Sequence, residues 1–474
     1  MDTALTETPQ SVPSSDGKIM LLILAPALVV AGLFYLGGAH ELAYGLGGMA
    51  LLVCIFLAPE IGLYVYCFTQ MFDQAMITEE TGIFTPSKVL GLVIVLAYLV
   101  HPRRRRTPML LSRPLIFTML VFGLYGLVTA AVSIAPLAAL RYGGQIIVQV
   151  MLVVVAIHRL SDRTRITRAL VFTVLGGAIG AFMMAGLGAR SDKFSGATLG
   201  QLSNPNSTAL ALSLALACVP AAWGFARHKL TRIGLLAAVP LILAAMMMTG
   251  SRSALVAVFL AAAMAVLLVG RAGAVQRVAI PLVSTLIIVG AAHFVLQSDL
   301  LGEHAKTRLG ALVAQGVETG RESRFFIWGA AFQTFLSRPW GFGYGNTAFA
   351  LELSHGIFID VHSSVLSALV DGGVVSFALF AWGGWLLFRY VRGIGRANPG
   401  IPAMMMFIFL VVSSLTHTIH FSKWFWMPVL FCVVLAEQAR REQVQEVREH
   451  TPQPEPMTAS DLVRQLGPED AVVY

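Results

Sequence analysis

The chain has 474 residues, 57% of them hydrophobic and only 12% charged, and its mean hydropathy is +0.75. Apolar runs of about twenty residues recur along almost its whole length, which excludes an ordinary soluble enzyme and predicts a polytopic helical membrane protein. The net charge of +8 is explained by basic loops on the cytoplasmic side of a membrane, so no nucleic-acid partner is expected.

The apolar runs predict an all-α fold with twelve to fourteen transmembrane helices in one integral membrane domain, residues 19–436. The first run is expected to be a retained span and not a signal peptide, because acidic residues precede it and no cleavage pattern follows. The predicted spans, in chain order, are 19–37, 42–58, 61–74, 86–100, 114–133, 142–158, 169–188, 207–225, 233–249, 253–270, 278–296, 372–388, 401–419 and 424–436.

Lysine and arginine gather in short loops, and two predicted spans separate each pair of neighbouring clusters. These loops are therefore expected on one side of the membrane, the cytoplasmic side, together with residues 1–18 and the C-terminal tail 437–474. The tail is polar and rich in proline, which predicts a disordered extension with at most a short helix. The basic clusters are residues 101–106, 159–168, 226–232, 271–277 and 389–396.

The opposite face is predicted to carry one long loop, residues 297–361, and long loops of this kind are usually functional. Its stretch SRFFIWGAAFQTFLSRP predicts a short helix, which either lies at the membrane interface on its aromatic side chains or packs within the loop. The following WGFGYGN is interpreted as a tight turn. A phosphate cradle is disfavoured, because no strand precedes these glycines and no P-loop lysine follows them.

Two arginines on this outer face oppose the general placement of basic residues. Arg252 lies in a tight turn, GSRS, between two apolar runs, and Arg190 lies at the outer end of the span 169–188. Both fit either a side chain that reaches from a helix end to the interface or a guanidinium that binds an anionic, phosphorylated substrate.

The stretch DVHSSVLSALVDGGVVS, residues 360–376, places a titratable imidazole at the start of an apolar run. His362 is a candidate general base, although a histidine at a helix start is often only a structural group. Asp360 is left open as an orienting carboxylate, and Ser363 as a helix cap. His417 and His420 are three residues apart near the same face, but no zinc site is expected without a convincing third ligand.

The residues from Arg324 to about Ser376 resemble the signature region of the O-antigen ligase and Wzy-type polymerase superfamily. His362 and Ser363 are followed by nine residues and then by Gly373, Val374, Val375 and Ser376, with the last position departing from the usual Gly, Thr or Tyr. GSRSAL at 250–255 is similar to the family's arginine turn. NPN at 204–206, with Arg190 upstream, is similar to its Asn-Pro-Asn element, so the resemblance covers about residues 190–436.

The resemblance implies a bacterial inner-membrane glycosyltransferase that uses neither a metal nor another cofactor. Such an enzyme moves a glycan from undecaprenyl diphosphate to an acceptor hydroxyl at the periplasmic face. His362 is then expected to be the catalytic base, and Arg190, Arg252 and Arg324 to bind the donor diphosphate.

The acceptor is left open between the lipid A core for a ligase, another repeat unit for a polymerase of O-antigen or exopolysaccharide, and a Ser or Thr side chain for a protein-directed relative. The alternative function is a transporter or flippase of lipid-linked saccharide. That function predicts ionisable residues at mid-membrane, which are nearly absent from the predicted spans.

Overall fold

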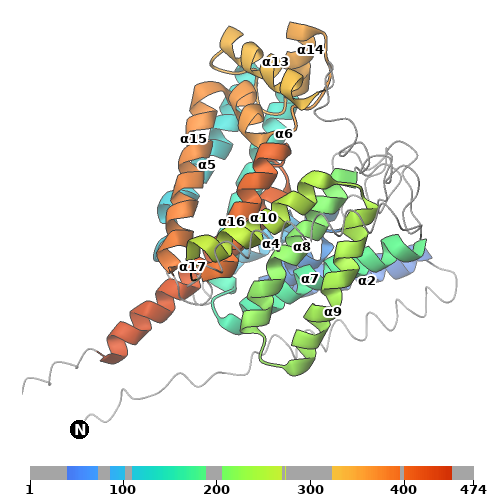
Figure 1. The fold of residues 1–474 in the computed structure, drawn as a ribbon, viewed down its shortest axis with the longest axis vertical. Coiled ribbons are helices and arrows are strands. Elements are labelled where there is room, and N and C mark those ends of the chain that lie inside the picture. The colour runs from blue at the N-terminus through green and yellow to red at the C-terminus, as the bar shows by residue number, and fades with distance from the viewer. Residues whose placement is uncertain are drawn as a thin grey trace, which may run out of the picture.

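The computed structural model describes residues 40–72, 86–101, 109–187, 205–269, 273, 323–395 and 400–450. Every regular element in these segments is a helix (Figure 1). Six of the helices are long and apolar enough to cross a membrane, and four further apolar helices are shorter. The predicted all-α membrane class is confirmed in these segments. The number of twelve to fourteen spans stays a prediction, and two predicted spans, 19–37 and 278–296, lie outside the segments.

The described helices are named in chain order, with the labels of Figure 1. Their bounds are α2 His40–Leu57, α3 Pro59–Thr69, α4 Pro86–Val100, α5 Arg113–Val128, η1 Thr129–Val132, α6 Pro136–Arg159, α7 Arg163–Leu187, α8 Pro205–Phe225, α9 Lys229–Met248, α10 Arg252–Val269, α13 Arg324–Ser337, α14 Thr347–His355, α15 Ser364–Ile394, α16 Gly400–Thr416 and α17 Lys423–His450.

Several helices differ from the predicted spans at their ends, and α6 and α7 each begin six residues before the predicted starts at 142 and 169. Helix α15 begins at Ser364 and not at 372, because the Ser363 side chain accepts a hydrogen bond from the Leu366 N–H and caps the helix eight residues earlier. Helix α17 continues to His450, so the first part of the predicted tail is helical. Helix α3 has only 11 residues, which at about 1.5 Å per residue spans roughly half of a bilayer's hydrocarbon core.

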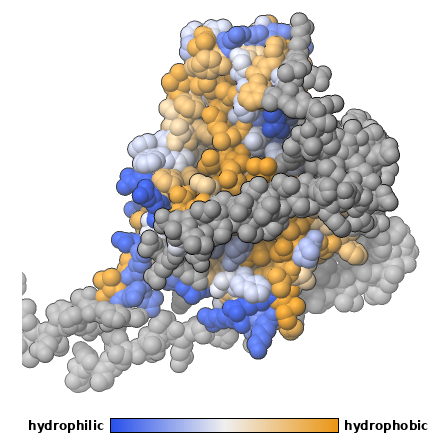
Figure 2. Space-filling model, in the orientation of Figure 1, coloured by the Kyte–Doolittle hydropathy of each residue, from blue (hydrophilic) through white to orange (hydrophobic). Residues whose placement is uncertain are grey.

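Helix α8 is the central helix of the described bundle. Its apolar window is 78% buried, whereas that of α9 is 28% buried, so α9 lies at the periphery. Long apolar side chains such as Phe117 and Phe182 stay exposed on the outside of the bundle. Figure 2 shows the resulting apolar band between more hydrophilic groups at the two ends. This pattern is the one expected of helices that contact lipid.

The bundle has two distinct ends (Figure 1). Helices α13 and α14 lie at one, on a small apolar core that includes Ile327, Phe342 and Val370. We call it the α13–α14 end. The opposite end of the bundle carries Arg163, Arg227, Arg389 and Arg440, and we call it the arginine end.

Contacts across the chain show that the basic clusters share the arginine end. The Arg163 guanidinium pairs with Glu442 of α17 at 2.7 Å, and it also lies over the ring of Phe225 at the end of α8. The guanidinium of Arg159 contacts the carbonyl oxygen of His101 at 3.4 Å. Parts of the clusters 101–106, 159–168 and 226–232 therefore gather there with α17, as their predicted common side requires.

Candidate functional site

Four helix termini meet beside the α13–α14 end. The N–H and the hydroxyl of Ser364, the first residue of α15, both donate to the carbonyl oxygen of His417, just after α16, at 3.0 and 2.8 Å. The hydroxyl of Ser253, in the first turn of α10, lies 3.2 Å from Nε2 of His417. Trp328 of α13 donates its indole N–H to the carbonyl oxygen of Val361 at 3.1 Å. Residues more than 160 positions apart thus form one site.

His362 is held in an unusual backbone conformation in this site. Its φ angle is +50°, and it is the only residue other than glycine with positive φ in the described part of the chain. This conformation costs roughly 1–2 kcal/mol for an L-residue, and such strain is concentrated at functional sites. The side chain is about one third exposed, so the imidazole is held at the surface of the site and is accessible to a substrate.

Asp360 lies against His362. Its Oδ1 accepts hydrogen bonds from the His362 N–H at 3.3 Å and from the Thr418 hydroxyl at 2.7 Å. Its Oδ2 is 3.8 Å from Nδ1 of His362, an ion-pair distance that is too long for a hydrogen bond. The carboxylate is therefore fixed by Thr418 beside the imidazole, the position from which it can stabilise a protonated ring. Sequence spacing alone had left the role of Asp360 open.

His417 is the buried polar centre of the site, with 6% of its surface exposed. Besides the Ser253 contact, its Nδ1 lies 2.9 Å from the Thr416 hydroxyl. Burial lowers its pKa to about 3, and the positive charge of the nearby Arg324 acts in the same direction. His417 is therefore neutral near pH 7 and links α10, α15 and α16. The sequence placed His417 near the same face as His362 but gave no reason to expect its contacts with Ser253 and Ser364.

The predicted arginines are only partly placed. Arg324 is the first residue of α13, half-buried, and close enough to lower the pKa of His417. Arg252 begins α10 directly before Ser253, so its backbone is at the site, while its side chain is outside what the structure describes. Arg190 lies outside the described residues altogether. The structure thus brings Arg324, His362 and the start of α10 together and does not report on Arg190.

Asp371 is a buried anchor that the sequence analysis did not single out. Its carboxylate accepts hydrogen bonds from the Asn346 N–H at 3.0 Å, the Thr347 hydroxyl at 2.7 Å and the Ser367 hydroxyl at 3.0 Å. It therefore joins the start of α14 to α15. The carboxylate next to two glycines within an apolar run was the available signal.

The WGFGYGN stretch is a tight turn, as predicted. Gly341, Gly343 and Gly345 all have positive φ, and the turn packs on α15 through hydrogen bonds from the Phe342 and Gly343 N–H groups to α15 carbonyl oxygens. A Cβ atom on Gly373, where α15 departs from helical geometry, would overlap the Pro339 carbonyl oxygen. The glycine that ends the sequence motif is therefore needed to seat this turn.

An apolar cavity of about 110 Å³ begins just inside the site. Val365 and Ser414 line it, and each is next to or within three residues of Ser364 or His417. From there it extends between α5, α15, α16 and α17 past Phe380, Gly384 and Met119. Ser414 is its only polar side chain, so the cavity suits a hydrocarbon chain.

Comparison with known proteins supports the resemblance seen in the sequence. Residues 237–381 match the family model described as O-antigen ligase. The match covers under a third of the chain and includes Arg252, Arg324 and His362. No curated protein matches the chain significantly. The match thus supports the predicted superfamily for residues 237–381, which include His362 but not His417 or Thr418.

Proposed function

We propose that this chain, as a member of the O-antigen ligase superfamily, transfers a glycan from a polyprenyl diphosphate to an acceptor hydroxyl. The observation that carries the proposal is the convergence of Arg324, His362 and the first turn of α10 at one end of a membrane bundle, with Asp360 held against the imidazole. A base and cationic groups in one site are what this reaction requires.

In the proposed step, His362 takes the proton of the acceptor hydroxyl as its oxygen forms a bond to the anomeric carbon of the donor glycan. The bond between that carbon and the diphosphate oxygen breaks, and polyprenyl diphosphate leaves with the electron pair. Asp360, 3.8 Å from Nδ1, stabilises the imidazolium that forms. Arg324, Arg252 and Arg190 are assigned to the diphosphate, whose developing charge guanidinium groups can neutralise.

The apolar cavity supports a lipid-linked donor. Two of its lining residues, Val365 and Ser414, are close in the chain to Ser364 and His417, and the cavity continues between α15 and α16. A diphosphate at the arginines would place the first part of a polyprenyl chain beside Val365 and Ser414. We assign the cavity to that segment of the donor.

The proposed membrane orientation places the α13–α14 end in the periplasm and the arginine end in the cytoplasm. The support is the gathering of the basic clusters at the arginine end, because lysine and arginine are retained on the cytoplasmic side. The site then lies on the periplasmic face of a bacterial inner membrane, with both termini in the cytoplasm.

Replacement of His362 tests the catalytic assignment. Purified full-length H362A, assayed for glycan transfer from a lipid-linked donor, is expected to lose about 10²-fold or more of the rate, the usual contribution of a general base. H228A is the matched control, because His228 is exposed at the opposite end and its side chain makes no capping hydrogen bond to α9. Near-normal transfer by folded H362A would refute the assignment.

Lipid-linked saccharide transport is the second candidate, and Asp371 is the observation that bears on it. An ionisable residue inside a membrane helix is a feature of transporters. Asp371, however, is fully buried and accepts three hydrogen bonds from groups on α14, the turn before it and α15. That environment favours an anchor. Lipid-linked saccharide movement in vesicles without any new glycosidic product would reverse this ranking.

The molecule that supplies the acceptor hydroxyl remains to be identified. Lipid A core, a second lipid-linked repeat unit and a Ser or Thr side chain all supply the hydroxyl that His362 would deprotonate. Reconstitution with each acceptor in turn distinguishes a ligase, a polymerase and a protein-directed enzyme, since only the true acceptor gains the glycan.

A further inference from the structure

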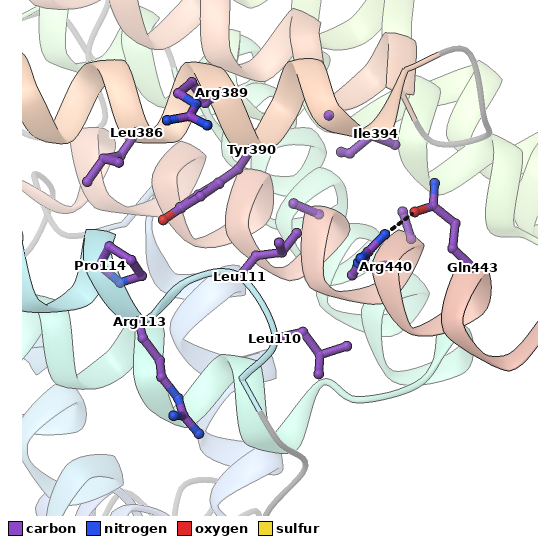
Figure 3. A pocket seen from close by; sticks show the side chains of 13 residues that line it. Leu110, Leu111, Arg113, Pro114, Leu386, Arg389, Tyr390, Ile394, Arg440 and Gln443 are labelled. Atoms are coloured by element: carbon purple, nitrogen blue, oxygen red, sulfur yellow. Dashed lines mark hydrogen bonds between the residues drawn. The ribbon is translucent and has the colours of Figure 1, made fainter. Parts of the chain in front are cut away.

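A second cavity, of about 600 Å³, lies at the arginine end of the bundle (Figure 3). It is an open pocket bordered by the segment before α5 and its start, the last turns of α15 and the middle of α17. Apolar side chains, including Leu111, Leu386 and Ile394, form much of its wall, and none of its lining residues is acidic. Its volume is within the usual range of small-ligand sites.

Three arginines line this cavity, each from a different helix. Arg113 is on α5, Arg389 on α15 and Arg440 on α17, and all three are exposed. In the described part of the chain, none of them forms an ion pair with a carboxylate, and Arg440 contacts only the amide oxygen of Gln443, at 3.3 Å. Figure 3 shows Arg113 and Arg389 on opposite sides of the cavity. The three arginines thus border the same cavity from three different helices.

Glu437, which does not line the cavity, is occupied by hydrogen bonds behind its wall and leaves the arginines available. The carboxylate of Glu437 accepts hydrogen bonds from the N–H groups of Leu110, Leu111 and Ser112 and from the Ser112 hydroxyl, at 2.6 to 3.0 Å. These bonds fix the segment before α5 against α17. With four donors on its oxygens, Glu437 holds two walls of the cavity together.

We propose that this cavity binds the phosphate headgroup of an anionic membrane lipid, with the start of its acyl chains along the apolar wall. Guanidinium groups bind phosphate oxygens through paired N–H donors, and basic pockets between membrane helices bind anionic headgroups. A free phosphate ion would satisfy the arginines, but it would leave the apolar wall without a contact. The site is at the opposite end from His362 and is independent of the proposed transfer reaction.

Native mass spectrometry of the full-length protein in detergent micelles tests the proposal. Dioleoyl phosphatidylglycerol is titrated against the zwitterionic dioleoyl phosphatidylcholine as the probe pair. Each arginine near a headgroup contributes roughly a fivefold gain, so the first phosphatidylglycerol is expected to bind at least about tenfold more tightly. The triple variant R113Q/R389Q/R440Q is expected to remove that preference.

Two further variants make the result specific to the cavity. R227Q/K229Q/R392Q removes the same number of exposed positive charges outside the cavity and is expected to keep the preference. G393L keeps all three arginines and is expected to lose it, because Gly393 lines the cavity and a Cβ there meets no atom within 4 Å, so the leucine extends into free space.

A preference for phosphatidylglycerol that survives both R113Q/R389Q/R440Q and G393L overturns the proposal. So does a preference that is lost equally in R227Q/K229Q/R392Q. Inorganic phosphate at millimolar concentration is expected not to displace the lipid, and complete displacement would assign the site to a free phosphate ion.

Discussion

Loss of the Asp371 anchor is predicted to destabilise the α13–α14 end. In Asp371→Ala, three donors at 2.7 to 3.0 Å lose their acceptor in a place with no solvent exposure. A buried donor without a partner costs about 1–3 kcal/mol, but relaxation and water entry reduce the sum of three. We expect a net loss of about 3–5 kcal/mol, which is below the roughly 3–9 kcal/mol that three full penalties would give. Asp371→Asn keeps one oxygen and should lose less.

The measurement is the unfolding of the full-length protein in detergent micelles, followed by intrinsic fluorescence against temperature or denaturant. T173V is the matched control, because Thr173 is equally buried and its hydroxyl bonds to the Ala169 carbonyl oxygen of its own helix. Its expected cost is about 1 kcal/mol or less. If Asp371→Ala cost no more than T173V, the carboxylate would not be the anchor, and the hydrogen bonds would be incidental to stability.

Three further outcomes are expected. Gly384→Leu should raise the apparent KM for lipid-linked donor severalfold by filling the apolar cavity, whereas Gly48→Leu, an equally unhindered site on α2, should not. Arg324→Glu should also raise that KM, and an unchanged value would remove Arg324 from the diphosphate site. Burial lowers the folded-state pKa of both His417 and His420 from 6.5 to about 3. Below pH 6.5 the unfolded chain therefore binds more protons than the folded chain, and the free energy of unfolding decreases as the pH decreases. At about pH 5 each histidine is expected to cost roughly 2 kcal/mol of stability. His420→Leu should remove the contribution of one histidine, measured as the difference in thermal stability between about pH 7.5 and pH 5.

Much of the architecture was predictable because it depends on local composition. Runs of apolar residues identified most of the described helices. The order of His362, Ser363 and Gly373 indicated the O-antigen ligase family, whose model matches residues 237–381. The helix boundaries were less predictable, since the cap at Ser363 and the continuation of α17 to His450 depend on side-chain contacts that hydropathy does not register.

The site depended on contacts between distant parts of the chain. Thr418 positions Asp360 from 58 residues away, and Ser253 meets His417 across 164 residues. Asp371 reaches Asn346 and Thr347 only because α15 breaks at Gly373 and leaves room for the glycine turn. No periodicity or spacing in the sequence specifies such pairs, because they are set by which helix ends pack together.

By itself, the sequence determined that this protein is a helical membrane protein with its basic loops grouped together and a histidine at the start of a late helix. Hydropathy and charge determine these properties residue by residue, so they need no fold. The tertiary structure alone decided that the Asp360 carboxylate lies against the His362 ring, that His417 is buried in the same site, and that three arginines from three helices line a cavity at the opposite end. Distances, burial and shared cavities exist only after the helices have packed.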